Sequence, residues 1–424
     1  MTAIAGHSPF AALWRLLRDP ASWMAAVDVF AILTAVALPF STSLTAICVV
    51  AMLIAWIPFL DLRAFLHLLR RPIAAVPIAF FVLALLGTLW SDAAWGTRLY
   101  GVFPTAKLLV LPVLFYHFQR SERGVWVLVS FFLSCMLLMI MSWLVAYMPW
   151  VSLKPAAEAS RGIFVKNYID QSQEFTLCAM ALAYPAIKLI RARKILPAAL
   201  LCAAGLSLIA NMAFVIVSRT ALVTIPIMLA VFGLVHLRLR TNMLVFTAAA
   251  VGALVIWAAS PQLEATVTTF SRDYRLYKDS QVPTSIGERL EYWKGALSFF
   301  AEAPLVGHGT GSTRGLFDAA SQRPGWITGV KPLGNPHNQT LNVAVQWGAL
   351  GIVVLYAMWL VHLLQFRGEG FASWIGLLVV VQNVFTSLFN SHLFDFHEGW
   401  MYVLAVGIAG GIVLNKRQVS AEVR

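Results

Sequence analysis

The stretch VWVLVSFFLSCMLLMIMSWLVAY, residues 125–147, is an apolar run without a single charged side chain. A helix that crosses the hydrocarbon core of a bilayer needs about 20 such residues. Comparable runs recur from Met24 to the C-terminus, and the chain as a whole is 60% hydrophobic and 12% charged. That is about half the charge of an average soluble protein. The sequence therefore predicts an all-α polytopic membrane protein.

The apolar runs predict about twelve membrane-spanning helices. We expect them at residues 23–41, 43–60, 73–90, 103–118, 125–147, 172–190, 195–217, 220–237, 243–260, 341–364, 372–390 and 399–415. No repeat or low-complexity tract divides the chain, so residues 1–424 are expected to form a single membrane domain. Residues 9–23 carry Arg15 and Arg18 and fit a short amphipathic helix lying on the membrane.

The net charge of +12 is concentrated at every second connection between the predicted spans. Cytoplasmic loops of membrane proteins are enriched in lysine and arginine, so both termini are expected in the cytoplasm. Attraction to anionic lipid accounts for this charge, and no nucleic-acid partner is expected. Two larger loops, residues 148–171 and 261–340, then face the opposite side. The second lies between spans 9 and 10 and is the expected place for chemistry.

Residues 261–340 are predicted to be an extracytoplasmic insertion that contains helices. Ser285 and Glu288 have the spacing of a capping box, and apolar residues follow at helical spacing. These apolar residues are Leu290, Trp293, Leu297 and Phe300. Arg289 is expected to point toward the membrane domain. The glycine-rich segment 307–312 lacks the features of a nucleotide-binding loop and is expected to be a flexible turn.

Four cations in or near the outer loops could bind an anion. Arg219 lies between two apolar runs, where a charge is costly and usually functional; the alternative is a guanidinium that reaches the lipid headgroups. Arg161 and Lys166 lie in the first outer loop, where ordinary solvated charges are an equally acceptable interpretation. Lys107 lies near the outer end of its predicted span.

His337 precedes an apolar run in the segment Asn335-Pro336-His337-Asn338. Asn335 is suited to cap a helix and Pro336 to occupy its first position, which would place His337 in the first turn. There the helix dipole disfavours the imidazolium form, so the neutral ring could accept a proton. A purely capping role for His337 fits the local pattern equally well.

The last outer loop contains His392, Asp395, His397 and Glu398, but not in a metal-ligand spacing that we recognise. No outer loop contains an acidic pair such as Asp-x-Asp, which hard divalent cations favour. We therefore predict neither a metal nor another cofactor. Arginines, whose planar guanidinium groups bind phosphate oxygens in pairs, would have to bind any diphosphate.

Four motifs in the C-terminal half resemble, in their order and together with the topology, the O-antigen ligase and polymerase superfamily. They are Ser218-Arg219-Thr220-Ala221-Leu222, Arg289-x-x-x-Trp293, Pro304-Leu305-Val306-Gly307-His308-Gly309, and Pro336-His337-Asn338-x-x-Leu341 with Gln346-Trp347-Gly348-x-x-Gly351. The resemblance implies a GT-C-type helical fold and transfer of a glycan from undecaprenyl diphosphate. In ligases the acceptor is a sugar hydroxyl of the lipid A-core oligosaccharide, at the periplasmic face of the bacterial inner membrane.

The resemblance also implies a metal-independent, inverting reaction in which His337 matches the essential histidine. Arg219 and Arg289 match the arginines of the family, and Arg161 is assigned with them to the donor diphosphate. Supporting roles are expected for Asn338, Trp293, Lys107 and Lys166.

Other functions stay open at this point. An O-antigen polymerase or a protein O-oligosaccharyltransferase would use the same donor with a different acceptor. A lipid-linked glycan transporter would carry charges in the middle of its spans. Such charges are nearly absent here, with Asp28 as the main exception.

Overall fold

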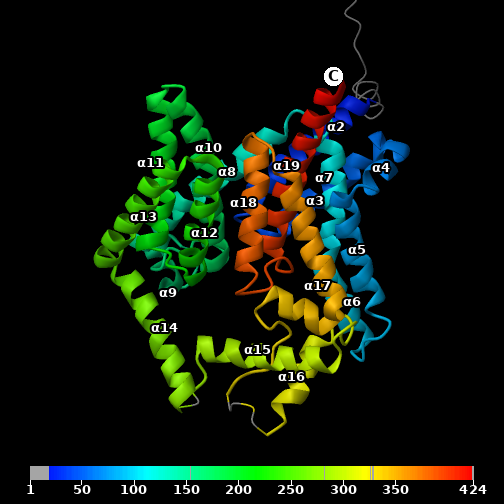
Figure 1. Ribbon diagram of the computed structural model, residues 1–424, viewed down its shortest axis with the longest axis vertical. Coiled ribbons are helices and arrows are strands. Elements are labelled where there is room, and N and C mark those ends of the chain that lie inside the picture. The colour runs from blue at the N-terminus through cyan, green and yellow to red at the C-terminus, as the bar shows by residue number, and fades with distance from the viewer. Residues whose placement is uncertain (1–18, 153, 281, 325, 327–328, 423–424) are drawn as a thin grey trace, which may run out of the picture.

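The computed structural model describes residues 19–152, 154–280, 282–324, 326 and 329–422, and every regular element in these ranges is a helix (Figure 1). The predicted all-α class is confirmed. Most of the amphipathic helix expected at 9–23 lies outside the described residues. From Pro20 onward the chain already belongs to α2, because the side chain of Asp19 accepts hydrogen bonds from the first backbone N–H groups and so begins that helix.

The helices follow one another along the whole chain. They are α2 (Pro20–Ala37), α3 (Thr42–Trp56), η1 (Ile57–Phe59), α4 (Leu62–Leu69), α5 (Pro72–Leu86), α6 (Trp95–Ala106), η2 (Lys107–Leu109), α7 (Val110–Phe118), α8 (Gly124–Tyr147), η3 (Pro149–Val151), α9 (Ala156–Ala159), α10 (Tyr168–Arg191), α11 (Ile195–Phe214), α12 (Arg219–His236), α13 (Leu239–Ala259), α14 (Pro261–Ser280), α15 (Ser285–Glu302), α16 (Thr313–Ser321), α17 (Gln339–Gln365), α18 (Phe371–Thr386) and α19 (Phe396–Glu422).

Within the described residues, nine helices are long and apolar enough to cross a membrane. The count becomes ten if α4 and α5, which meet at an angle of 80°, form one bent span. The protein is therefore multi-pass, but the expected count of twelve is not established. Each of the twelve predicted ranges does contain a helix. Of these helices, α18 has only 16 residues, and α10 carries polar groups at both ends.

The helices form two groups with the insertion beneath them (Figure 1). Helices α10 to α13 lie on one side, and α3, α5, α7 and α17 to α19 lie on the other. Helix α14 descends from α13, and α15 and α16 lie across the ends of the membrane helices, far from the C-terminus. Helix α19 is central, because 94% of its apolar window is buried, whereas the window of α13 has no buried residue.

Glycines allow α19 to approach α7 closely. A Cβ atom at Gly407 would lie 2.6 Å from Leu114, and one at Gly410 would lie 2.4 Å from Phe115. Small residues at helix contacts are the usual way for membrane helices to pack without a hydrophobic driving force. This packing fixes the position of α19 along α7, and with it the position of the loop that precedes α19.

Helix α17 is broken at Gly348, which has φ +60°. The backbone of Pro304 and Leu305 fills the break: the N–H groups of Ala349 and Leu350 donate to their carbonyls at 2.8 and 3.2 Å. Residues 304–311 are thus joined to α17 by main-chain hydrogen bonds. The expectation of a flexible turn at 307–312 is wrong, because the N–H groups of residues 308–310 donate to carbonyls of α17 and of Gly87 at 2.8–2.9 Å.

The start and the buried face of α15 also differ from expectation. Its N-cap is Thr284, whose hydroxyl accepts from the N–H of Gly287 at 3.1 Å. Ser285 is already helical, so the predicted capping box of Ser285 and Glu288 does not form. The face that packs on the insertion core contains Tyr292, Ala296 and Phe299, whereas Leu297 of the predicted stripe is 55% exposed.

Candidate functional site

His337 lies before α17 and not in its first turn. The helix begins at Gln339, and its N-cap is Asn338, whose side-chain oxygen accepts from the N–H of Leu341 at 3.0 Å. Asn335 instead accepts from the backbone N–H of His337 at 2.9 Å. This turn holds His337 at φ +52°, a conformation that is uncommon for residues other than glycine. The predicted cap at Asn335 is therefore wrong by three residues.

Hydrogen bonds around the imidazole determine which nitrogen carries the proton. Nδ1 of His337 lies 2.9 Å from Oδ1 of Asn390. The Nδ2 group of Asn390 donates to Asp395 at 2.7 Å, and Oδ1 of Asn390 also accepts from Asn335 at 3.1 Å. Because the amide nitrogen is committed to a carboxylate, the amide oxygen must accept from Nδ1–H. In the neutral ring, Nε2 is then the nitrogen that can accept a proton.

Helix α15 brings an arginine to the histidine. The rings of Tyr292 and His337 have centroids 6.0 Å apart, and the Tyr292 hydroxyl donates to the carbonyl of Lys331 at 2.8 Å. Arg289 lies three residues earlier on the same helix, so its side chain neighbours that of Tyr292. Burial, with a smaller contribution from Glu288, raises the pKa of Tyr292 to about 12. The phenol therefore remains a neutral donor beside the histidine.

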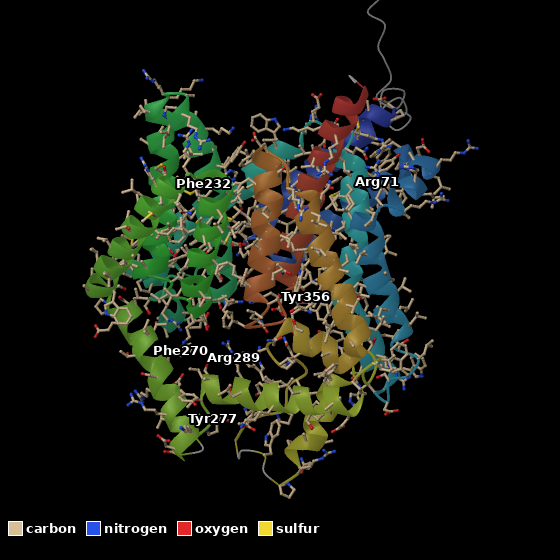
Figure 2. All side chains as sticks on the ribbon, viewed as in Figure 1. Arg71, Phe232, Phe270, Tyr277, Arg289 and Tyr356 are labelled. Carbon is tan, nitrogen blue, oxygen red and sulfur yellow. The ribbon has the colours of Figure 1, made fainter. Side chains whose placement is uncertain are left out.

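Arg219 and Arg289 lie close enough to repel each other. Burial lowers the pKa of Arg289, and the charge of Arg219 lowers it further, whereas Tyr168 raises it. Arg219 begins α12 and contacts Asp273 of α14 at 3.4 Å, with its guanidinium 5.4 Å from the ring centre of Phe270. Figure 2 labels Arg289 and Phe270 in the region between α15 and the membrane helices. The two arginines with one carboxylate leave an excess of positive charge, as an anion site requires.

Arg161 reaches the same region through Tyr168. Its guanidinium lies 5.1 Å from the centre of the Tyr168 ring, and its side chain is exposed. Tyr168 begins α10, because the side chain of Asn167 caps that helix at 2.8 Å from the N–H of Ile169. Tyr168 thus interacts with both Arg161 and Arg289. Tyr168 therefore links two of the three predicted arginines, and the third, Arg219, lies near Arg289.

Trp293 offers a hydrogen-bond donor one turn beyond Arg289. Its indole N–H is buried and, among the residues that the structure describes, has no partner. A buried N–H without a partner costs free energy, which a ligand with an acceptor atom would recover. Trp293 is therefore suited to donate to a group held by Arg289.

Lys107 binds the loop before α19, and Lys166 binds the first turn of α19. Lys107, at the break between α6 and α7, donates to the carbonyls of Phe394 at 3.1 Å and Asp395 at 2.5 Å. Lys166 donates to the carbonyl of Leu38 and to Nδ1 of His397 at 2.5 Å. Burial lowers the pKa of Lys166, against the attraction of nearby carboxylates such as Glu174. The interpretation of Lys166 as a solvated surface charge is wrong.

One group of side chains has the chemistry of a metal site. The ligand atoms of His392, Asp395 and Glu398 all lie within 4.8 Å of one another. The carboxylates already accept hydrogen bonds, Asp395 from Asn390 at 2.7 Å and Glu398 from Gln173 at 3.0 Å. That the protein needs no metal stays a prediction.

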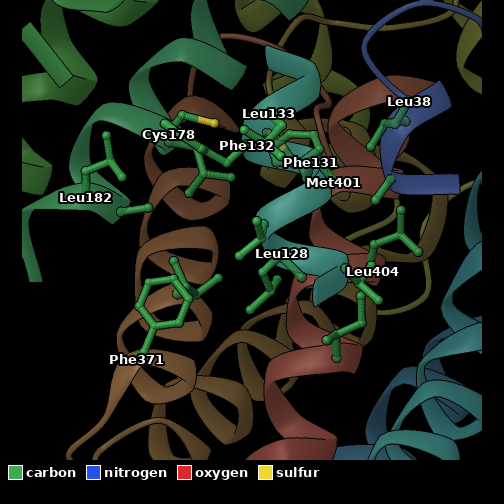
Figure 3. A pocket seen from close by; sticks show the side chains of 18 of the residues that line it. Leu38, Leu128, Phe131, Phe132, Leu133, Cys178, Leu182, Phe371, Met401 and Leu404 are labelled. Atoms are coloured by element: carbon green, nitrogen blue, oxygen red, sulfur yellow. The ribbon is translucent and has the colours of Figure 1, made fainter. Parts of the chain in front are cut away.

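An apolar cavity of about 420 Å³ lies among α8, α10, α18 and α19 (Figure 3). Side chains such as Phe131, Leu182 and Met401 line it. Such a lining suits a hydrocarbon chain. Leu38 also lines the cavity, and its carbonyl accepts from Lys166, so the cavity ends near the polar groups of the outer loops.

Sequence reasoning missed four residues of this region: Tyr168, Asp273, Tyr292 and Asn390. Three of them meet their partners across 53 to 121 positions of the chain, and no local motif marks such a contact. Only Tyr292 carried a usable signal, because it lies three residues after Arg289 in a predicted helix.

No curated protein matches the chain. The family model Wzy_C, described as O-antigen ligase, matches residues 204–356, about a third of the sequence. The matched segment runs from α11 into α17 and contains Arg219, Arg289 and His337, so the resemblance seen in the motifs is confirmed. Residues 204–356 are similar to the O-antigen ligase family.

Proposed function

We propose that the protein is an O-antigen ligase of the bacterial inner membrane. It transfers O-antigen polysaccharide from undecaprenyl diphosphate to a sugar hydroxyl of the lipid A-core oligosaccharide at the periplasmic face. One observation supports this most directly: α15 carries Arg289 beside Tyr292, whose ring lies 6.0 Å from that of His337. Helix α15 thus carries a cation for a diphosphate one turn from the tyrosine that neighbours the proposed base.

In this proposal His337 is the general base. The acceptor oxygen attacks C1 of the carrier-linked sugar, and its proton passes to Nε2 of His337. The bond between C1 and the phosphate oxygen breaks, and its electron pair stays on the released undecaprenyl diphosphate. A single displacement of this kind inverts the anomeric centre. A positioned base contributes about 10²- to 10⁴-fold to such a rate.

The arginines stabilise the charge that develops on the leaving diphosphate. Arg219 and Arg289 bind it directly, Arg161 adds a third cation through its contact with Tyr168, and Trp293 donates a hydrogen bond. In most enzymes, charge stabilisation of this kind lowers the barrier more than any other single effect. Asn338 begins the helix beside His337, Lys107 holds the loop before α19, and Lys166 contacts His397 in the first turn of α19. The fold proposed for this reaction is of GT-C type.

The reaction needs neither metal nor nucleotide, because the carrier linkage is already activated and arginines replace a divalent cation. The proposed partners are undecaprenyl-diphosphate-linked O-antigen, lipid A-core oligosaccharide and membrane lipids. Both termini are proposed to lie in the cytoplasm, with the insertion 261–340 in the periplasm.

The test is an assay with purified protein, carrier-linked O-antigen and rough lipopolysaccharide in excess EDTA. Lipopolysaccharide of lower mobility, formed by the native protein and absent with His337→Ala, is the expected result. The melting temperature of the variant is compared with that of the native protein to show that it is folded. Elongation of the carrier-linked glycan would instead identify a polymerase, and transfer to added protein an oligosaccharyltransferase. Ligation by His337→Ala would overturn the assignment of the base.

A further inference from the structure

The loop between α18 and α19, residues 387–395, is joined to the segment around His337 by a dense set of hydrogen bonds. These bonds run from Gln339 N to Ser387 O at 2.8 Å, Asn338 Nδ2 to Leu388 O at 3.2 Å, Ser391 Oγ to Asn335 Oδ1 at 2.7 Å, Asn342 Nδ2 to Ser391 Oγ at 3.0 Å, and Leu393 N to Gln339 Oε1 at 3.1 Å. The position of His337 therefore depends on this loop as much as on its own helix.

Within this loop, Asn390 links the imidazole to a carboxylate. Its Oδ1 receives Nδ1–H of His337 at 2.9 Å, and its Nδ2 donates to Oδ2 of Asp395 at 2.7 Å. A hydrogen bond to a carboxylate polarises the amide, which makes its oxygen a stronger acceptor. The charge of Asp395 thus acts on His337 through one intervening side chain.

The surroundings hold Asp395 where this link requires it. Lys107 donates to the main-chain carbonyl of Asp395 at 2.5 Å, and His392 Nδ1 lies 3.3 Å from its carboxylate. His392 is 1% exposed, so this side of the carboxylate is fixed by buried groups. Asp395 is therefore fixed from its backbone and from its side chain before any substrate binds.

We propose that Asn390 and Asp395 are positioning residues for His337. Asn390 keeps the hydrogen of the resting imidazole on Nδ1, so that Nε2 faces the acceptor, and Asp395 stabilises the imidazolium that forms when Nε2 takes the proton. An amide does not accept that proton, so it stays on His337 until it is released to solvent. This role rests on the proposed function of His337 as the general base.

A swap of the two groups provides the sharpest test. Asp395→Asn is isosteric and removes only the charge, and Asn390→Ala removes the link. In the double variant Asn390→Asp with Asp395→Asn, a carboxylate at position 390 can accept Nδ1–H directly, and an amide at position 395 can donate to it. The number of hydrogen bonds is conserved while the charge moves next to the imidazole.

We expect each of Asn390→Ala and Asp395→Asn to lower kcat for ligation by about 10- to 100-fold, as loss of an orienting partner commonly does. KM for donor and acceptor should stay near that of the native protein, because neither residue binds substrate. The double variant should recover most of the lost kcat. A purely structural pair would change the melting temperature and leave kcat per folded molecule unchanged in all three variants, so a fall in kcat that the double variant reverses identifies the positioning role.

The matched control is Asn383→Ala on α18. Asn383 is a buried amide that accepts from Trp359 Nε1 at 3.0 Å, so its loss should lower the melting temperature without changing kcat per folded molecule. If Asn390→Ala and Asp395→Asn keep native kcat while His337→Ala is inactive, the positioning role is wrong and the proposed function stands. If KM rises at constant kcat, or the double variant is no better than Asp395→Asn, the positioning role is likewise wrong. Ligation by His337→Ala would instead refute the proposed function.

Discussion

Burial and, to a smaller extent, the charge of Arg219 lower the pKa of Arg289, so the two guanidinium groups repel each other, as expected of side chains that bind an anion. Asp273 offsets part of this repulsion at 3.4 Å from Arg219, but one carboxylate cannot neutralise two guanidinium groups. A diphosphate would relieve the repulsion and gain paired hydrogen bonds from each planar group. Ligand binding and catalysis are thus expected to depend on the shape of these side chains as well as on their charge.

Arg219→Lys should therefore be severely impaired in ligation although the charge is kept. An ammonium group offers no pair of parallel donors, and we expect a loss of about 10²-fold or more, the size seen when one donor to a developing charge is removed. The measurement is the initial rate of the lipopolysaccharide ligation assay, with the thermal stabilisation by inorganic diphosphate as a second readout.

Arg272→Lys on α14 is the matched control. Arg272 is exposed and lies next to Asp273 in the chain, so the same substitution there should leave the rate unchanged. A native rate with Arg219→Lys would mean that Arg219 only reaches lipid headgroups.

The sequence predicted His337 as a site residue, but it did not predict the turn that holds it or its hydrogen-bond partners. Two asparagines, Asn335 and Asn338, stand three residues apart, and both are good helix caps. Which of them caps α17 depends on Asn390 and the loop before α19, which the local sequence does not reveal. Arg161 was predicted from its place in the first outer loop and from the resemblance, and its contact partner Tyr168 shows no pattern that points to the site.

Among the elements, α17 carries the most demanding contact. Gly348 adopts φ +60°, and a Cβ atom there would lie 2.4 Å from the carbonyl carbon of Leu305. The main chain of Pro304 and Leu305 supplies the carbonyls that the broken helix lacks. Two of the family-like motifs, 304–309 and 346–351, are therefore the two sides of a single contact.

Gly348→Ala should destabilise the protein by about 1–3 kcal/mol, because it combines an unfavourable φ with a clash against rigid backbone. The measurement is the melting temperature in detergent. Gly252→Ala on α13 is the control, since no atom lies within 4 Å of the added methyl group. Its melting temperature should stay the same or rise, because alanine is the better helix former. Equal melting temperatures for both variants would contradict the role of the contact.

Hydropathy predicted where the helices lie, but not the buried polar groups of α10 or the break in α17. Apolar runs located a helix in every expected range, because burial in lipid requires such runs. Helix α10 fails the criterion for a membrane span since its first turns carry Gln173 and Glu174, which are buried against His392, Glu398 and His397. The break at Gly348 was invisible because a glycine in an apolar run does not by itself predict a kink.

At the scale of the whole molecule, the start of α2 and the C-terminal end of α19 lie on one side of the membrane helices (Figure 1). Helices α15 and α16 of the insertion lie on the opposite side. Figure 2 labels Arg71, from one of the basic connections, near the end that holds the C-terminus. Cytoplasmic retention of such clusters is the strongest determinant of orientation in membrane proteins.

We therefore expect both termini in the cytoplasm and the insertion in the periplasm. A green fluorescent protein fused to the C-terminus should fluoresce, and alkaline phosphatase at the same place should be inactive. Phosphatase inserted after Arg323, in an exposed segment beyond α16, should be active. The opposite pattern would reverse the orientation and place the arginines on the cytoplasmic side.

Because the backbone of Pro304 and Leu305 fills the break in α17, the C-terminal part of the insertion is held more firmly on the membrane helices than its first helix, α14. Residues 304–311 are fixed to α17 and to the end of α5 by main-chain hydrogen bonds, and α15 packs on this segment through Phe299, which contacts His308. Helix α14 follows α13, which has no buried residue in its span, and packs on α15 through Tyr277, whose hydroxyl donates to Glu291. If α14 and its Asp273 moved to make room for a bulky lipid-linked glycan, this contact with α15 would break, whereas the bonds between residues 304–311 and α17 would stay. Such a displacement would uncover Arg219 at the moment of entry while the imidazole keeps its place.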